Sequence, residues 1–339
     1  MQEENAAQTI IAPAPRCRLE VTGPPTFSVV IPAYQASATI REAVASALRQ
    51  TSPPREVIVV DDGSTDDPGA ALAPFAGEIQ LIRKENGGVA SARNVGIGAA
   101  TGEFVSFLDA DDRFHPRRLE ALGALASARP DLDILATDAV ITVEGVRRSL
   151  FSAATPFPTH DQRTAIFDAC FVVGPAVRLE RLRDIGGYDE SLQVANDWDC
   201  YVRLILDGAI AGCVPEPYYE YRQSEDSLTA NRRRALQGRV EVLRKARRRT
   251  DLTRNERAAL RRALSRHHTR AALAELESEL NGLHEQSGNR VPRGRILRQL
   301  TSRYVTQRGR MLLLLAILAP RIAQRHLPRD RGTLLNRFS

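Results

Sequence analysis

The chain has 339 residues, enough for a core of roughly 200 to 250 residues with an appendage, and its 43% hydrophobic and 26% charged content is ordinary for a soluble protein. Its four cysteines (Cys17, Cys170, Cys200 and Cys213) form no C-x-x-C pair and have no histidine at zinc-finger spacing, which excludes a disulfide framework or a zinc knuckle and favours reduced thiols in the cytoplasm. The first residues are acidic and lack a long apolar core, so no secretory signal is predicted.

The net charge of +6 is concentrated at the C-terminal end. Residues 290–339 hold twelve arginines, no lysine and one acid, and therefore carry +11, whereas the other residues carry −5. The apolar run 311–320 within this segment is too short for the roughly 20 residues of a membrane-spanning helix. This run has two possible interpretations, an interfacial membrane helix and a buried helix of a C-terminal bundle. The predicted partner of residues 290–339 is an anionic membrane surface, with a partner protein as the alternative. Specific nucleic-acid binding is not favoured, because the segment has few aromatic residues for base stacking.

Short apolar runs alternate with helix-compatible segments after a lead-in, residues 1–24, that lacks periodicity. Strands are predicted at 27–32, 57–60, 79–84 and within 103–112, where each run is rich in apolar and β-branched residues. Helices are predicted after Ser37 as N-cap, across the small-residue segment 87–100, and from Pro116 onward with Leu119, Leu122 and Leu125 on one face. This alternation predicts an α/β fold with a mostly parallel, Rossmann-like sheet flanked by helices.

The second half of the chain predicts a different organisation. Residues 171–208 read as a strand, a short helix, a Gly-Gly turn and a helix from about Asp197 to Leu206. From residue 231 the chain is Arg-rich and helical, and Thr253 with Glu256 forms a capping box. The predicted division is a flexible lead-in at 1–24, a catalytic α/β domain at 25–230 and a helical C-terminal region at 231–339.

Acidic residues follow two of the predicted strands. Asp61 and Asp62 end one strand, and Asp109, Asp111 and Asp112 end another, at the sheet edge where α/β folds bind ligands. In a D-x-D sequence, the period of two in an extended chain puts both carboxylates on one side. Such a pair can hold a hard divalent cation whose remaining ligands come from a diphosphate. The alternative is an acid-rich surface loop.

Four segments in this order resemble the family 2 glycosyltransferases of the GT-A fold, over about residues 26–228. They read FSVVIPAYQASATIREAVASALRQT, EVIVVDDGSTDDP, ENGGVASARNVGIGAATGEFVSFLDADDRFHP and IGGYDESLQVANDWDCYVRLILDG. The resemblance implies a donor site for a nucleotide-diphospho-sugar, UDP- or dTDP-linked, in which Asp62 accepts a hydrogen bond from the base. It implies Mn²⁺ or Mg²⁺ as cofactor, held by Asp109 and Asp111, with Asp112 orienting the loop. The nucleotide-sugar-binding residues that it implies are Pro32, Ala33, Tyr34, Asp62, Arg93, Asp109, Ala110, Asp111 and Arg222.

The resemblance assigns the catalytic base to Asp197, which would remove the proton of the acceptor hydroxyl during inverting displacement. Two positions depart from the family pattern. Asn196 stands where an acidic residue is usual, and Ser224 stands where a histidine is frequent. The chain also lacks the Q-x-x-R-W motif of processive synthases. The predicted function is therefore non-processive transfer of one sugar to a saccharide or a lipid-linked saccharide in cell-surface polysaccharide or glycolipid assembly, by a cytoplasmic protein peripheral on the inner face of the membrane. The alternatives are a degenerate nucleotide-sugar-binding protein and a sugar-nucleotide nucleotidyltransferase.

Overall fold

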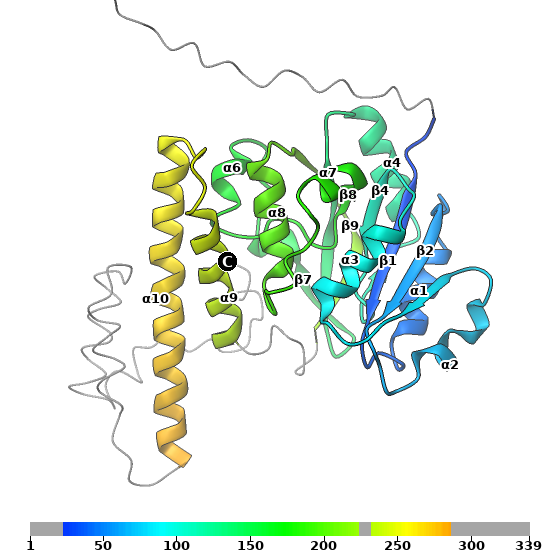
Figure 1. Cartoon of the computed structure of the whole chain (residues 1–339), viewed down its shortest axis with the longest axis horizontal. Helices are drawn as coiled ribbons and strands as arrows, with labels where there is room; N and C mark the ends of the chain where they lie inside the picture. The colour runs from blue at the N-terminus through cyan, green and yellow to red at the C-terminus, as the bar shows by residue number, and fades with distance from the viewer. Residues whose placement is uncertain (1–22, 224–231, 286–339) are drawn as a thin grey trace, which may run out of the picture.

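The computed structural model describes residues 23–223 and 232–285, which form one nine-stranded mixed sheet with helices on both faces (Figure 1). Four strands run parallel, as the sequence predicts, and their order in the sheet is β3-β2-β1-β4. Their bounds are β1 Phe27–Ala33, β2 Glu56–Asp61, β3 Gln80–Arg83 and β4 Phe104–Phe107. The runs of β1, β2 and β4 are mostly apolar because helices cover both faces of these strands; the polar exceptions are Ser28, Glu56, Asp61 and Ser106.

Alternate residues of β1 serve two separate cores. Val30 belongs to the core under α3 (Val89–Ala99), and Val29 and Ile31 belong to the core under α1 (Ile40–Leu48). This division follows from the period of two along a strand. Gly96 lets α3 approach the sheet, since a Cβ there would lie 2.3 Å from Cγ1 of Val30.

The start of α1 corrects one prediction. The N-cap residue is Thr39, not Ser37, and the amide of Ser37 instead donates a 2.8 Å hydrogen bond to Asp66. This hydrogen bond ties the loop 34–38 to the loop after β2. The N-cap of the helix is therefore Thr39, further along the chain than the predicted Ser37. One face of α1 is apolar and packs against the sheet, with Ile40, Ala43, Val44 and Ala47 buried.

The remaining strands make the sheet mixed. β8 (Ala176–Arg178) runs antiparallel to β4, and beyond it β6 (Ile134–Val143) pairs parallel with the long β9 (Ala211–Gln223). The smaller elements of the chain are α2 Pro68–Leu72, η1 Ala73–Phe75, β5 Arg113–Phe114, α4 Arg118–Ala128, β7 Val146–Leu150, α5 Phe151–Ala154, α6 Gln162–Ala165, α7 Leu179–Asp184 and α8 Asn196–Leu206. The predicted order of strand, short helix, Gly-Gly turn and helix corresponds to β8, α7, Gly186–Gly187 and α8.

Two helices follow the sheet domain, α9 (Arg232–Ala246) and α10 (Arg254–Glu285). They lie side by side, and α9 contacts α8 (Figure 1). The predicted capping box is confirmed: the Thr253 amide donates to Glu256 at 2.8 Å, and the Glu256 amide donates to the Thr253 hydroxyl at 3.2 Å. Residues 1–22 of the predicted lead-in 1–24, the position of Ser224 and the basic segment 290–339 lie outside the described residues. Within 23–223 and 232–285, none of the helices combines the length and apolar character needed to cross a bilayer.

Candidate active site

A cavity of about 1340 Å³ lies at the carboxyl ends of β1, β2 and β4 and extends to α8, α9 and α10. Every residue to which the sequence assigns a site role is part of its lining: Pro32, Ala33, Tyr34, Asp62, Arg93, Asp109, Ala110, Asp111, Asp197 and Arg222. These positions span most of the sheet domain in sequence, and the fold brings them into one space.

At one end of the cavity, Asp62 fixes the turn that precedes α3. Its buried carboxylate accepts hydrogen bonds from Lys84 Nζ at 2.7 Å and from the amides of Gly87 and Gly88 at 3.0 and 2.7 Å. Tyr34, with 54% of its surface exposed, lines the same end. Asp62 therefore shapes the backbone around the end where the sequence predicts the nucleotide base, a structural task that the sequence did not reveal.

Its neighbour Asp61 has a different task. One carboxylate oxygen of Asp61 accepts a 2.9 Å hydrogen bond from the amide of Ser64, and the other lies 3.4 Å from Arg83. Asp61 thus caps the Gly-Ser turn after β2. It is absent from the cavity lining.

The D-x-D loop begins two residues after β4 and is attached to β9. Asp112 is fully buried; it accepts 2.7 Å and 2.8 Å hydrogen bonds from the Tyr219 hydroxyl and the Arg222 amide. The Arg222 side chain donates through Nε to the Asp111 carbonyl and pairs through Nη1 with Glu42 at 2.7 Å. These contacts hold the loop in place, the orienting role predicted for Asp112.

Asp109 and Asp111 have the chemistry that a divalent cation requires. Both line the cavity, and burial together with the negative charge of Asp109 raises the pKa of Asp111 to about 6. A cation between the two carboxylates would offset that repulsion. Among the described residues, no group of three or more His, Cys, Asp or Glu side chains is arranged to hold a metal. Mg²⁺ is usually bound by one or two carboxylates together with phosphate oxygens of a substrate. Asp109 and Asp111 fit such an ion.

Arg93 connects the D-x-D loop to the start of α8. Its Nη2 donates to Asp109 at 2.8 Å and its Nη1 donates to Asn196 at 3.0 Å, although these two partners are 87 positions apart in the sequence. The guanidinium is buried and packs 5.2 Å from the centre of the Tyr188 ring. Asn196, the departure from the family pattern, is therefore a hydrogen-bond acceptor in a buried chain of contacts.

Asp197 lies in the first turn of α8 with its side chain exposed toward the cavity. One carboxylate oxygen accepts a 2.7 Å hydrogen bond from the amide of Trp198. The helix start is anchored because the Trp198 indole donates to the carbonyl of Ile166 at 2.7 Å. Asp197 is thus an accessible carboxylate on a fixed backbone, as a general base requires.

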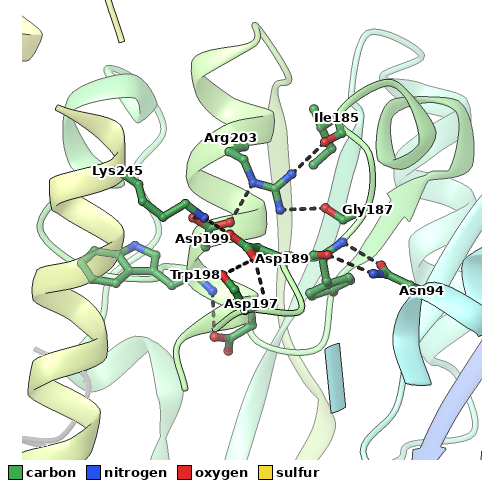
Figure 2. A network of polar contacts seen from close by, with 11 residues as sticks. Asn94, Ile185, Gly187, Asp189, Asp197, Trp198, Asp199, Arg203 and Lys245 are labelled. Carbon is green, nitrogen blue, oxygen red and sulfur yellow. Dashed lines mark hydrogen bonds and ion pairs between the residues drawn. The ribbon is translucent and has the colours of Figure 1, made fainter. Parts of the chain in front are cut away.

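A polar network behind Asp197 holds the loop between α7 and α8 (Figure 2). Asn94 accepts from the Tyr188 amide at 2.7 Å and donates to the Tyr188 carbonyl at 2.9 Å. A Cβ on Gly187 would lie 2.5 Å from Oδ1 of Asn94, so the close approach requires glycine. Asn94 and Gly187 lie in two of the four segments that resemble the family, but the contact between them is not visible in the sequence.

The same network joins α9 to the domain. Lys245 Nζ lies 2.5 Å from Asp189 and 2.7 Å from Asp199, and Asp199 also pairs with Arg203 at 2.7 Å (Figure 2). Arg203 in turn donates to the carbonyls of Ile185 and Gly187. A lysine from the predicted C-terminal region therefore supports the loop and helix that carry Asp197.

The sequence of this domain matches a known family. The profile described as Glycosyl transferase family 2 matches residues 28–177. Residues 28–177 are therefore similar to glycosyltransferase family 2. The matched residues contain the D-x-D loop and all but one residue each of β1 and β8, whereas Asp197 follows the matched segment.

Individual family 2 relatives are similar over part of their length. An uncharacterized glycosyltransferase of Rickettsia typhi is 29% identical over 195 residues, 53% of this chain and 59% of that protein. The succinoglycan biosynthesis protein ExoO of Rhizobium meliloti is 28% identical over 218 residues, 60% of this chain and 63% of that protein. The chain thus spans about six-tenths of the length of these relatives.

Solved structures share the fold over nearly the whole chain. S. aureus TarS 1–349 in complex with UDP-GlcNAc has a TM-score of 0.60 at 21% identity, covering 89% of this chain and 90% of that one. The mannosyltransferase PcManGT of Pyrobaculum calidifontis, in complex with GDP-Man and Mn²⁺, has a TM-score of 0.56 at 22% identity, covering 91% and 89%. The fold of this chain is accordingly the GT-A fold, as the sequence predicts.

Proposed function

We propose that this chain is a non-processive, inverting glycosyltransferase that moves one sugar from a nucleotide-diphospho-sugar to an acceptor hydroxyl. The observation that carries the proposal is the single cavity that Tyr34, Asp62, the D-x-D carboxylates and Asp197 share. Similarity to glycosyltransferase family 2 and the nucleotide-sugar complexes of the two GT-A structures support it.

The donor is proposed to lie with its base near Pro32, Ala33 and Tyr34, and its diphosphate at the D-x-D loop. Asp109 and Asp111 would hold Mn²⁺ or Mg²⁺, which supplies positive charge that stabilises the departing nucleoside diphosphate. Arg93 keeps Asp109 oriented through its 2.8 Å ion pair, and Glu42 keeps Arg222 against the loop. Asp62 suits a uracil or thymine base, whose ring N–H can donate to a carboxylate.

Asp197 is proposed to accept the proton of the acceptor hydroxyl as that oxygen forms its bond to the anomeric carbon. The bond to the leaving diphosphate breaks on the opposite face, so the configuration at that carbon inverts. A general base must lie within hydrogen-bond reach of the hydroxyl. The exposed position of Asp197 on the anchored start of α8 allows this approach.

The acceptor is proposed to be a saccharide or a lipid-linked saccharide in cell-surface polysaccharide or glycolipid assembly. The similarity to a succinoglycan biosynthesis protein supports the polysaccharide class. The +11 charge of residues 290–339 supports peripheral attachment to an anionic membrane on its inner face. Flotation with anionic liposomes tests this attachment: the full chain should float, a chain ending at residue 289 should not, and equal behaviour would contradict it.

The experiment for the catalytic proposal is turnover of radiolabelled UDP-sugars in Mn²⁺ by the wild type and by Asp197→Asn. A preceding thermal-shift screen of nucleotide sugars identifies the donor. The replacement of the usual acid by Asn196 favours a second candidate, a nucleotide-sugar-binding protein without turnover. That candidate predicts that both proteins bind the nucleotide and that neither consumes any donor.

A further inference from the structure

Arg118, the first residue of α4, is a charged side chain in the core of the sheet domain. It is 0% exposed and is among the largest side chains that are fully buried. Burial lowers the pKa of Arg118 to about 10, which leaves the guanidinium charged at neutral pH. Because the burial of a charge is costly, a core arginine requires compensating contacts.

The hydrogen-bond partners of Arg118 are neutral. Its Nη1 donates to the hydroxyl of Thr137 on β6, and its Nη2 donates to the carbonyl of Gly174 at 2.5 Å. Its Nε is buried without a hydrogen-bond partner. Within residues 23–223 and 232–285, no carboxylate forms an ion pair with Arg118, and the groups whose charge raises its pKa are Tyr219 and Cys213. Arg118 therefore does not serve as the counter-charge of an acid.

Two aromatic rings pack against Arg118. Its guanidinium carbon lies 4.8 Å from the centre of the Phe114 ring and 4.8 Å from the centre of the Tyr219 ring. Phe114 and Tyr219 are paired across β5 and β9, and their ring centres lie 5.7 Å apart. The attraction between a cation and an aromatic ring is strongest where water is excluded, as it is around this side chain. Arg118 thus restricts the orientation of the Tyr219 ring.

Gly174 contacts the same ring from the loop before β8. A Cβ on Gly174 would lie 2.2 Å from Cε2 of Tyr219, so the backbone of Gly174 packs directly on the ring. Because Arg118 donates to the carbonyl of Gly174, one guanidinium contacts both the ring and the segment packed on it. Gly174 and Tyr219 line the cavity, whereas Arg118 is absent from the lining.

The Tyr219 hydroxyl connects this cluster to the D-x-D loop, since it donates to Asp112 at 2.7 Å. Burial, and after it the charge of Asp112, raises the pKa of this hydroxyl, whereas the charge of Arg118 lowers it. The hydroxyl stays protonated and is the donor in the bond. The Asp112 amide donates in turn to the Asp109 carbonyl at 3.0 Å, which closes the loop into a turn. A shift of the Tyr219 ring would therefore move the loop that carries Asp109 and Asp111.

We infer that Arg118 is a positioning residue for the proposed cation site, and that it sets the spacing of Asp109 and Asp111 through Tyr219 and Asp112. The inference rests on the proposed function, because that proposal makes Asp109 and Asp111 the ligands of Mn²⁺ or Mg²⁺. Arg118 acts on an aromatic ring and on a backbone carbonyl at the same time. Lysine cannot reproduce this combination, because its ammonium group lacks the planar fork of a guanidinium.

The first test measures the loop itself, by hydrogen exchange and mass spectrometry on the full chain without ligands. Peptides that cover residues 108–115 and 218–223 should exchange at least about tenfold faster in Arg118→Met than in the wild type, because the loop loses its support. Tyr219→Phe removes only the hydroxyl and should raise exchange in the same peptides. Arg118→Lys keeps the charge and should lie between Arg118→Met and the wild type. If Arg118→Met does not fold, Arg118→Lys and Tyr219→Phe give the same comparison.

Arg178→Met is the matched control. Arg178 is also a largely buried arginine on an aromatic ring, since its guanidinium carbon lies 4.6 Å from the centre of the Phe104 ring. It differs from Arg118 because it pairs with Glu103 at 2.5 Å and has no contact with the cavity lining that leads to the D-x-D loop. Arg178→Met should lower the free energy of unfolding, but it should not raise exchange of the loop peptides above that of the rest of the chain. This control separates a loss of overall stability from a loss of loop position.

The second test measures UDP affinity by titration calorimetry, with Mn²⁺ and with EDTA. Arg118→Met and Tyr219→Phe should each remove most of the gain in affinity that Mn²⁺ gives the wild type. The double variant should lose no more than the larger single loss, because both residues act through one chain of contacts. UDP affinity in EDTA should stay within about twofold of the wild-type value, because the metal-free nucleotide does not depend on the spacing of the two carboxylates. Arg178→Met should behave as the wild type.

The inference is overturned if loop exchange in Arg118→Met equals that of the wild type or rises no more than in Arg178→Met. A full Mn²⁺ effect in a variant whose loop exchange is raised would also overturn it. If UDP binding by the wild type does not depend on Mn²⁺, the cation site and this inference both fail. Donor turnover is measured on the same samples. Its absence from a wild type whose Mn²⁺ effect depends on Arg118 would overturn the proposed function alone, and normal turnover by Arg118→Met with wild-type loop exchange would overturn the positioning role alone.

Discussion

Arg93 donates a 2.8 Å hydrogen bond to Asp109, the first carboxylate of the D-x-D loop. The same guanidinium donates to Asn196, the residue before the proposed base. A displacement of Arg93 would therefore disturb the donor-binding loop and the start of α8 together. This arrangement explains how an asparagine can replace the usual acid, since it supplies a neutral acceptor to an arginine whose charge Asp109 already balances.

Asn196→Ala should lower the free energy of unfolding by about 1 to 3 kcal/mol, because it leaves a buried N–H of Arg93 without an acceptor. Asn196→Asp keeps a hydrogen-bond acceptor at this position, so its free energy of unfolding should fall by less than that of Asn196→Ala. Urea unfolding of both variants gives the comparison. Equal losses from the two substitutions would show that the bond to Arg93 is not what Asn196 contributes.

Asp111→Asn should abolish the dependence of nucleotide affinity on Mn²⁺. In the wild type, removal of the metal with EDTA should weaken UDP binding at least about tenfold, or about 1.4 kcal/mol. Titration calorimetry with and without Mn²⁺ measures this. Glu78→Gln, an exposed acid outside the cavity lining, is the control and should behave as the wild type. A metal effect that persists in Asp111→Asn would contradict the assignment.

Lys245→Met should destabilise the chain in a pH-dependent way. Lys245, followed by Ser191, lowers the pKa of Asp189 from 3.8 to about 2. Because the folded pKa lies below the unfolded value, this contribution is complete above pH 4 and disappears as the pH falls toward 2. The difference in unfolding free energy between the wild type and Lys245→Met should therefore be constant from pH 7 to 5 and smaller at pH 3. Arg248→Gln, exposed just beyond α9, should show no such change. A difference that is the same at every pH would contradict the pairing.

Gly187→Ala should destabilise the chain more than Gly186→Ala does. Both glycines have positive φ angles, 71° and 75°, so each substitution carries the strain of a left-handed residue, about 1 kcal/mol or more. Only at Gly187 does the added Cβ also meet the Asn94 side chain, at 2.5 Å. Thermal and urea unfolding of the two variants measure the difference. Equal effects would mean that the contact with Asn94 is easily relieved.

The elements that the sequence predicts best are those with local signals. The apolar runs of β1, β2 and β4 and the Thr253–Glu256 capping box depend on neighbouring residues, and the structure contains them. The prediction of Ser37 as N-cap was wrong although its local pattern was equally clear. The Ser37 amide instead donates a hydrogen bond to Asp66, which joins two loops. Propensity cannot anticipate such a tertiary hydrogen bond.

The sequence could not reveal contacts that depend on how distant elements pack. The bond between Arg93 and Asn196 joins residues 103 positions apart. The parallel pairing of β6 with β9 depends on the order of strands in the sheet, not on the composition of either strand. Arg118 looked like one arginine among many, because only the packing of α4 against β5 and β9 brings it to the Phe114 and Tyr219 rings.

The central claim is that Asp197 is the base of a sugar transfer, and donor turnover by Asp197→Asn tests it most directly. The substitution keeps the size of the side chain and should leave UDP affinity within about twofold, but it should lower the rate of transfer or donor hydrolysis at least about 100-fold, since general-base catalysis contributes about 10²- to 10⁴-fold. Turnover by Asp197→Asn within a few-fold of the wild-type rate, with the nucleotide bound normally, would contradict the account.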